Sequence, residues 1–451
     1  MKSDHSPWVD PKRRVVSQRE LAAMLAGHDA YLRGVSGGVR ANFKFRDLSH
    51  LDLSRVDLRE ADLTGAKLFG TRLIGANLAD ANLYSADLRL ANLEKANLTR
   101  ADMRGACLRG AVLQDAVMIE VDLRDGTMIQ WRQDGDVRIH APEPEPLSAE
   151  LTLASMRGAD LTRARLSNAF VVQTDLSDTV LRGAKFNNAN LTNADLTGSD
   201  LEGADLSSAN LSGARLQGAV LSNTLLDNAS FTNAILVGAI FDGPPSATVN
   251  FDGAITAATL ADKGIDLGGV LGEHGQWVQS GGKVGRRAEL VSLDMRGTTL
   301  SNVELSAAVL HCVTLASVPM DGASLAIADL SLADLRWVDL SRADLRGANL
   351  ERSTLTGAKL DGANLGPVRI QGPSSHVWRT NLRRARLSLV SLRDADLRMA
   401  NLANALLMEA DLRGADLRDA DLTGADLTGA KLDGCELEGA NLQDAVGLIR
   451  H

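Results

Sequence analysis

Aromatic residues make up only 3% of this 451-residue chain, far fewer than the core of an ordinary globular protein of this length would need. No run of 18 apolar residues occurs, so no segment is expected to span a membrane. The first residues, Met1 to Asp4, lack the apolar stretch of a secretory signal. The three cysteines are odd in number and scattered, which excludes a disulfide framework. We therefore expect a cytoplasmic protein with reduced thiols.

The charge balance is mildly acidic, because 57 acidic residues face 48 basic ones and give a net charge of −9. This balance argues against a general affinity for nucleic-acid phosphates. The eight histidines show no metal-ligand spacing, and neither a phosphate-binding glycine loop nor a nucleophile elbow occurs. We therefore expect no enzyme activity, no cofactor and no metal.

What the chain does contain is a period of five residues. Ala61, Asp62 and Leu63 are followed one period later by Ala66, Lys67 and Leu68, and the same spacing recurs near the end of the chain. On an α-helix this period would distribute the leucines around the whole cylinder, and on a flat strand it would alternate them between the two faces. The period is consistent with burial only if the chain turns a corner every five residues, which predicts a solenoid.

The quintet of alanine, aspartate or asparagine, central leucine or phenylalanine and two variable residues resembles the repeat of the pentapeptide-repeat family. The resemblance implies an all-β fold, a right-handed quadrilateral β-helix in which four quintets form one coil and the centre and alanine face inward. Four runs keep a constant phase, and their centres extend from Phe43 to Leu123, Leu151 to Phe241, Leu290 to Leu365 and Leu382 to Leu442.

The solenoid is predicted to be internally duplicated, with short helical caps. The segment Leu21, Leu25, His28 and Tyr31 matches Leu267, Leu271, His274 and Trp277, and each precedes a run of quintets. Each predicted helix would cover the open end of a stack, and the two histidines are expected to have structural roles. Val137-Arg138-Ile139 and Val368-Arg369-Ile370 form a second matching pair, within interruptions that we interpret as looped-out insertions.

These patterns give the following expected organisation: an N-terminal segment with a capping helix at 1–41, coils at 42–125, an interruption loop at 126–150, coils at 151–245, a linker with a second capping helix at 246–287, coils at 288–365, an interruption loop at 366–380, coils at 381–446 and a tail at 447–451. Cys435 occupies an alanine position and should be buried, whereas Cys107 occupies an outward position.

The most distinctive surface feature is the acidic end of the last run, which contrasts with its arginine-rich start. Together with one tryptophan from each interruption, its acids are the candidate partner-binding residues: Asp411, Asp416, Asp421, Asp426, Asp433, Glu436, Glu438, Trp131 and Trp378. The expected function is that of a non-catalytic interaction or scaffold solenoid. Its partner is an unidentified macromolecule, expected to be a protein and neither nucleic acid nor membrane.

An alternative follows from the family resemblance, since some members mimic DNA and modulate a type II topoisomerase, gyrase. Three features argue against this alternative: the negative charge is modest, arginines interleave the aspartates, and few residues follow Leu442. The oligomeric state is left open by the sequence.

Overall fold

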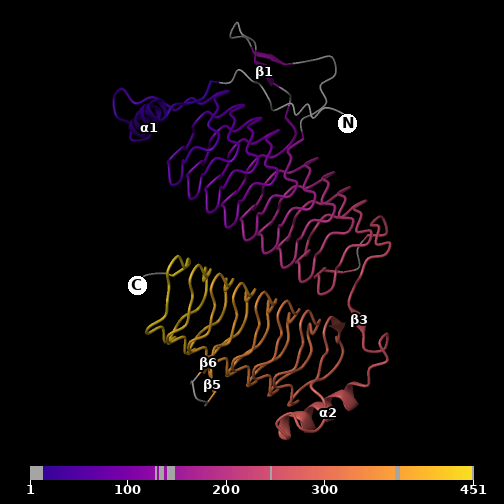
Figure 1. Cartoon of the computed structure of the whole chain (residues 1–451). Helices are drawn as coiled ribbons and strands as arrows, with labels where there is room; N and C mark the ends of the chain where they lie inside the picture. Colours follow the sequence, from indigo (N-terminus) through magenta and orange to yellow (C-terminus); the bar gives the residue numbers. More distant parts are fainter. Residues whose placement is uncertain are drawn as a thin grey trace. The chain divides into compact units, whose positions relative to one another are not determined.

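The structure is a computed structural model that describes residues 14–126, 129–131, 137–139, 148–243, 246–370 and 376–448 (Figure 1). The chain divides into two compact units. Unit 1 comprises Met1–Ile235 and Ile240–Ile255, and unit 2 comprises Leu236–Ala239 and Thr256–His451. Both are built from the same coil.

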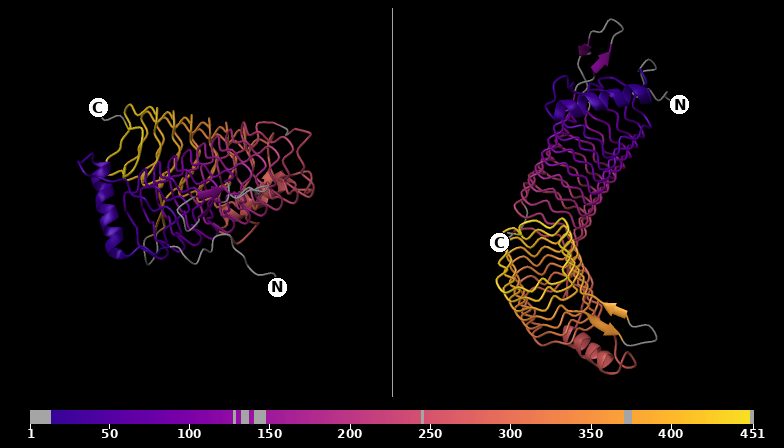
Figure 2. Two further views of the ribbon diagram at one scale, coloured as in Figure 1. Left: turned by 90° about the horizontal axis from the view of Figure 1, so that it is seen from above. Right: turned by 90° about the vertical axis from the view of Figure 1, so that its left-hand side faces the viewer.

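Each quintet contributes one short parallel bridge to its neighbours, and the partner lies four quintets further along the chain. Asp62 pairs with Asn82, and Asn82 pairs with Asp102. Four quintets therefore complete one coil, and successive coils stack as a right-handed quadrilateral β-helix, as the sequence predicts (Figure 2). Backbone hydrogen bonds join the coils in both directions, because the amide of Leu63 donates to the carbonyl of Asn82 at 2.7 Å and the amide of Asn82 donates to that of Ala61 at 2.9 Å.

The core is a narrow column of alanines and quintet centres. Ala61, Leu63 and Ala66 are each at most 1% exposed, and the same holds through most coils. Each buried leucine contributes about 2 kcal/mol of apolar burial, so a slender column without large rings suffices. This explains why the chain needs so few aromatic residues.

The corners are made by a residue in the left-handed backbone region. Gly65 takes φ 60° there, and His50 takes the same φ at the equivalent place in another quintet. Glycine adopts this conformation without steric cost, whereas other residues incur a penalty that the surrounding ladder must offset.

In unit 1, helix α1 (Gln18–Leu32) precedes the coils and an insertion interrupts them. The insertion contains a two-stranded antiparallel hairpin of β1 (Ile129–Trp131) and β2 (Val137–Ile139). Beyond it the ladder resumes in register, because Cys107 pairs with Glu150, a residue much further along the chain than one regular coil. The insertion is therefore looped out of a continuous stack.

The coils of unit 1 extend further than the boundary at residue 245 that we expected. Asn250 and Ile255 still pair with the preceding coil, and the ring of Phe251 stacks on that of Phe231 with centroids 5.3 Å apart. The sequence conceals this extension because Ser246 occupies a centre where leucine or phenylalanine was expected.

Unit 2 begins with β3 (Ala258–Thr259), which pairs in parallel with β4 (Leu293–Asp294). Helix α2 (Leu267–Gln279) lies between them in sequence. A second hairpin, β5 (Val368–Ile370) with β6 (His376–Trp378), is also looped out, since Asn349 pairs with Asn381 across the hairpin instead of with a residue one regular coil away.

The two Val-Arg-Ile segments are not equivalent in chain order, contrary to the sequence interpretation. Val137–Ile139 is the second strand of its hairpin, whereas Val368–Ile370 is the first. What the hairpins share is a cross-strand pair: Trp131 lies opposite Val137, and Trp378 lies opposite Val368. Similar strands therefore recur in reversed order in the two hairpins.

Both predicted capping helices are present, and α1 lies across the end of its stack (Figure 2). Ser17 caps α1 by accepting the amide of Glu20 at 3.2 Å. His28 and His274 are fully buried, and each accepts a hydrogen bond from the first coil, which confirms their structural role.

Two cysteines depart from expectation. Cys435 stands in the alanine column but is only partly buried, because it belongs to the last coil, whose leucines Leu432, Leu437 and Leu442 are also only partly buried. Cys107 stands in the outward column yet is 3% exposed. Its short side chain lies between the longer ones of Asp87 and Glu150 on the neighbouring coils.

Candidate interaction surface

The outward aspartates and asparagines hold the corners in place. In most quintets one side-chain oxygen accepts the backbone amide two residues further on. Asp421 accepts the amide of Thr423 at 3.1 Å, and Asp426 accepts that of Thr428 at 2.9 Å. This local bond fixes the turn that follows the centre. The carboxylates are therefore structural groups first, whatever else they contact.

Arginines two residues after an aspartate form paired hydrogen bonds with it. Arg413 donates to both oxygens of Asp411 at 2.8 and 2.7 Å, and Arg418 does the same to Asp416 at 2.9 and 2.6 Å. The hydrogen bond from Arg413 lowers the pKa of Asp411 to about 2, and that from Arg418 lowers the pKa of Asp416. Both carboxylates are therefore ionised at neutral pH and compensated by a neighbouring cation.

The coil distributes the seven candidate acids over its four faces. Asp416 and Glu436 share one ladder, whereas Asp411 pairs with Lys431 on the second. Asp421 lies on the third ladder and Asp426 on the fourth, on which Leu406 and Val446 are its neighbours. Asp433 acts electrostatically on Arg413, and Glu438 on Arg418. The acids thus form two arginine-centred groups and two separate positions instead of one patch.

The two tryptophans lie in the hairpins. Trp378, at the end of β6, is 48% exposed, and Trp131 is the last residue of β1. Trp131 lies in unit 1, whereas Trp378 and the acids at residues 411–438 lie in unit 2. Within unit 2, the hairpin of Trp378 leaves the ladder before the coils that carry these acids.

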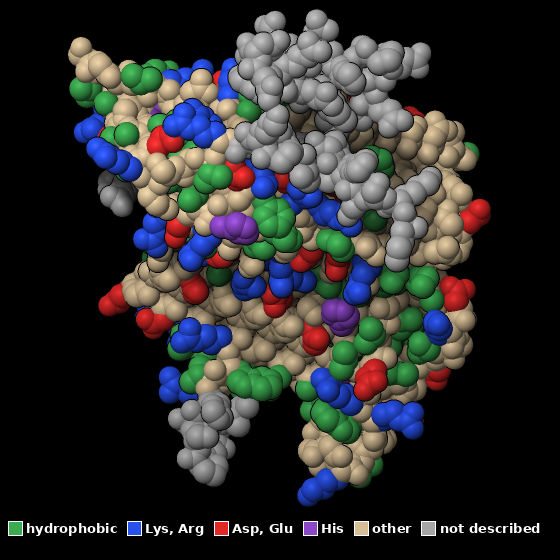
Figure 3. All heavy atoms as spheres, turned by 45° about the horizontal axis from the view of Figure 1, so that its top comes forward, with side chains coloured by type: hydrophobic (Ala, Val, Ile, Leu, Met, Phe, Trp, Pro, Cys, Tyr) green, Lys and Arg blue, Asp and Glu red, His purple; other side chains and the backbone are tan. Residues whose placement is uncertain are grey.

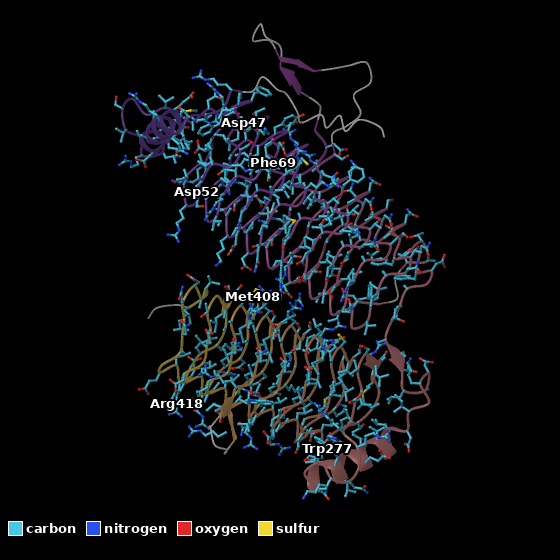
Figure 4. All side chains as sticks on the ribbon, viewed as in Figure 1. Asp47, Asp52, Phe69, Trp277, Met408 and Arg418 are labelled. Carbon is cyan, nitrogen blue, oxygen red and sulfur yellow. The ribbon has the colours of Figure 1, made fainter. Side chains whose placement is uncertain are left out.

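One face of unit 2 carries a continuous series of ion pairs, which we call the Arg418 column. Its members are Asp396, Arg398, Asp416, Arg418 and Glu436. Within a coil, arginine and aspartate lie 2.6 Å apart in both pairs. Between coils, Arg398 lies 3.5 Å from Asp416, and Arg418 lies 3.0 Å from Glu436. Figure 4 shows Arg418 at the outside of the last coils.

The pairs two residues apart can be read directly from the sequence, whereas those between coils depend on which residues the coil brings together. In each pair between coils, the acid follows the arginine by two residues less than one full coil. A related signal marks two cation–π contacts in unit 1, where Arg104 lies over Tyr84 and Arg89 over Phe69, each exactly one coil apart in sequence. The ring centroids lie 5.3 and 5.7 Å from the guanidinium carbons.

Acidic and basic side chains interleave on the face shown in Figure 3. The arginine-rich start of the last run follows the same pattern, because Arg383 pairs with Glu351 and Arg393 with Asp361. These parts of the surface therefore carry side chains of both signs instead of presenting one charge.

A thiol and an imidazole lie together at one corner of unit 2. The Sγ of Cys312 lies 3.2 Å from the Nε2 of His311, whose Nδ1 contacts the hydroxyl of Ser331 at 2.8 Å. Burial raises the pKa of the Cys312 thiol to about 12. The thiol is therefore protonated at neutral pH and unsuited to act as a nucleophile.

Among the described residues, no group of three or more histidine, cysteine or acidic side chains could hold a metal ion. In the same part of the chain, every helix is too short or too polar to cross a bilayer.

A family model described as pentapeptide repeats matches eight segments of the chain: residues 39–75, 76–115, 148–178, 174–213, 204–243, 328–366, 376–407 and 405–444. Together they cover well over half of the sequence. A search of curated proteins gave no match.

Solved structures provide three comparisons. HetL, a pentapeptide repeat protein involved in heterocyst differentiation regulation from the cyanobacterium Nostoc sp. strain PCC 7120, is 22% identical over 92% of this chain and 93% of its own, with a TM-score of 0.16. Rfr23 from the cyanobacterium Cyanothece 51142 is 35% identical over 24% of this chain and 63% of its own, with a TM-score of 0.16. Full-length QnrB1, a plasmid-mediated fluoroquinolone resistance protein, is 17% identical over 47% of this chain and 91% of its own, with a TM-score of 0.18.

Proposed function

Because the chain belongs to the pentapeptide-repeat family, we propose that it is a non-catalytic interaction protein that presents rigid, regularly spaced charges to a protein partner. The observation that carries this proposal is the Arg418 column. It places alternating charges on successive coils, which lie about 4.8 Å apart.

The column is suited to binding because its side chains are already ordered. Arg398 and Arg418 are each held by two hydrogen bonds to one aspartate, yet 50% and 43% of their side-chain surfaces remain exposed. Ordering a free arginine on binding would cost about 0.5–1.5 kcal/mol, and prior ordering reduces that cost. Exposed pairs of this kind contribute little to folding stability, so the arginines are not required for the fold and remain available to a partner.

The alternating signs also favour a protein over nucleic acid. A DNA mimic needs rows of uncompensated carboxylates, whereas each aspartate of the column faces an arginine. A partner with its own alternating charges would match this surface better. We therefore do not favour the topoisomerase alternative. It would require the protein to change DNA supercoiling by gyrase at micromolar concentration.

Affinity capture from the native cell extract tests the proposal. The bait proteins are the unaltered chain, Arg418→Glu and the matched control Arg413→Glu, which makes the same charge change on a different face of the coil. We expect one protein to co-purify with the unaltered chain and with the control but to be lost with Arg418→Glu. Equal recovery with all three baits, or recovery of no specific protein, would contradict the proposed surface.

A further inference from the structure

The two capping helices are attached to their stacks in the same way. In unit 1 the Nδ1 of His28 accepts the amide of Ala41 at 3.1 Å. In unit 2 the Nδ1 of His274 accepts the amide of Ala288 at 3.0 Å. Both imidazoles are fully buried, and the two alanines open the first coils. The hydrogen bond assigns each ring the neutral tautomer that carries its proton on Nε2, because Nδ1 must supply a lone pair.

The surroundings of the two rings also match. His28 stacks on Tyr31 with centroids 5.9 Å apart, and His274 stacks on Trp277 at 5.7 Å. In each unit an arginine just before the first coil, Arg40 or Arg287, donates to the backbone carbonyl at the equivalent position of the neighbouring coil. Figure 4 shows Trp277 on α2.

The charged groups near each ring are few. Asp57, Glu60 and Arg40 act on His28, and Glu304 and Arg287 act on His274. The acids favour the imidazolium and the arginines oppose it. Burial outweighs these charges at both sites and lowers both pKa values from 6.5.

Protonation is incompatible with the observed bond. An imidazolium carries N–H groups on both nitrogens, so its Nδ1 would point a donor at the donating amide of Ala41 or Ala288. It would also place a charge in a site without a paired counter-ion, which is costly. The ring can accept a proton readily only after the helix has moved away from the coil.

We propose that His28 and His274 are acid-sensitive latches that hold α1 and α2 on the first coils and release both helices together when the pH falls. The direction of the pH effect follows from the protonation state of the ring in the closed cap and in the open cap. The closed cap requires the neutral ring, whereas the open cap lets the ring protonate at its ordinary pKa. The closed caps therefore have their full stability above about pH 6.5 and lose it progressively as the pH falls below that value.

Release would expose the ends of both stacks. Leu21 of α1 is buried, and the partly buried Leu267, Val270 and Leu271 of α2 pack on the core of unit 2. An uncapped end would present unpaired backbone groups and an apolar column, both of which favour association with another chain.

Hydrogen exchange followed by mass spectrometry tests the proposal on the full-length protein. Exchange of Gln18–Leu32 and Leu267–Gln279 is measured at pH 7.5 and 5.5 and corrected for the intrinsic pH dependence. We expect the equilibrium constant for opening each cap to rise by up to about tenfold between pH 7.5 and pH 5.5. Proton linkage gives an increase of this size when the ring has a pKa of about 6.5 in the open state. Peptides from the coil centres, such as residues 61–98, should show no such increase.

The matched variant is His28→Asn combined with His274→Asn, because an asparagine oxygen supplies an acceptor that does not titrate in this range. His50→Asn, at an exposed corner, is the control. The double variant should lose the pH response, and the control should keep it. A response that persists in the double variant, or caps that exchange equally at both pH values in the unaltered chain, would overturn the proposal.

If the double variant does not fold, nuclear magnetic resonance of the unaltered chain provides the test. The two buried imidazoles should remain in the Nε2–H tautomer until the caps begin to exchange. Protonation of both rings near pH 6.5 without increased exchange of the caps would also overturn the proposal.

Discussion

Truncation of one inward leucine should weaken unit 2 by an amount that depends on its coil. Leu392 is 1% exposed and lies in an inward column between Leu360 and Leu412, whereas Leu432 belongs to the same column but occupies the last coil and is only partly buried. Leu392→Ala should cost about 3 kcal/mol, since it loses transfer free energy and leaves a cavity lined on both sides. Leu432→Ala should cost about 1 kcal/mol or less, because solvent already reaches that side chain.

Urea unfolding followed by tryptophan fluorescence measures the difference. Replacing Trp8 and Trp131 by phenylalanine leaves Trp277, Trp337 and Trp378, all in unit 2, as reporters. The slope of the free energy of unfolding against urea should be the same for both variants, and only the midpoint should move. Equal destabilisation by the two changes, or a loss below about 0.5 kcal/mol for Leu392→Ala, would refute the column of stacked leucines.

Three further predictions concern single positions. Thr71→Val should destabilise unit 1 by about 1 kcal/mol in urea unfolding, because the buried hydroxyl donates to the carbonyl of Leu48 at 2.9 Å, whereas Thr71→Ser should retain most of that stability. Asp411 contributes stability above pH 3.8 that is lost as the pH falls toward its folded pKa of about 2. Because Arg413 lowers that pKa, Arg413→Ala should raise it, as measured by a carboxyl titration with nuclear magnetic resonance. An unchanged pKa would contradict the pairing. Gly75, at φ 62°, should tolerate asparagine but lose about 1–2 kcal/mol of thermal stability on substitution by valine, and equal melting of the two variants would contradict the left-handed corner.

Most of the fold could be predicted because the five-residue repeat is visible in the sequence. The leucine at every fifth residue identifies the inward column. Because the chain turns one corner in each quintet, four quintets complete one square coil. The matching segments around His28 and His274 also predicted two helical caps, and both helices are present.

Three features were not predictable from the pattern. The extra quintets around Phe251 were missed because Ser246 lacks the apolar side chain that marks a quintet centre. The strand order of the hairpins lies outside the repeat, so the five-residue period carries no information on it. The partial exposure of Cys435 depends on its place in the last coil, which local sequence does not reveal.

The candidate site was harder to predict than the fold. Seven acids that are close together in sequence suggested one patch, but a coil of four faces separates residues that are one quintet apart and joins those that are four quintets apart. Asp416 and Glu436 therefore meet at Arg418, whereas Asp421 and Asp426 lie on other faces. The functional consequence of that arrangement is the subject of the capture experiment.

In unit 1 the assignment of residues to faces beyond the insertion depends on coils that stack in register across it, and a disulfide measures this register directly. Neighbouring ladder positions are about 4.8 Å apart, within the range that a disulfide spans. Under mild oxidation, native Cys107 should cross-link to Glu150→Cys, its ladder partner beyond the insertion, and not to Ser155→Cys, which pairs with Val112 on the next face. A cross-link at position 155 and none at position 150, identified by mass spectrometry of the digested protein, would contradict the continuous stack.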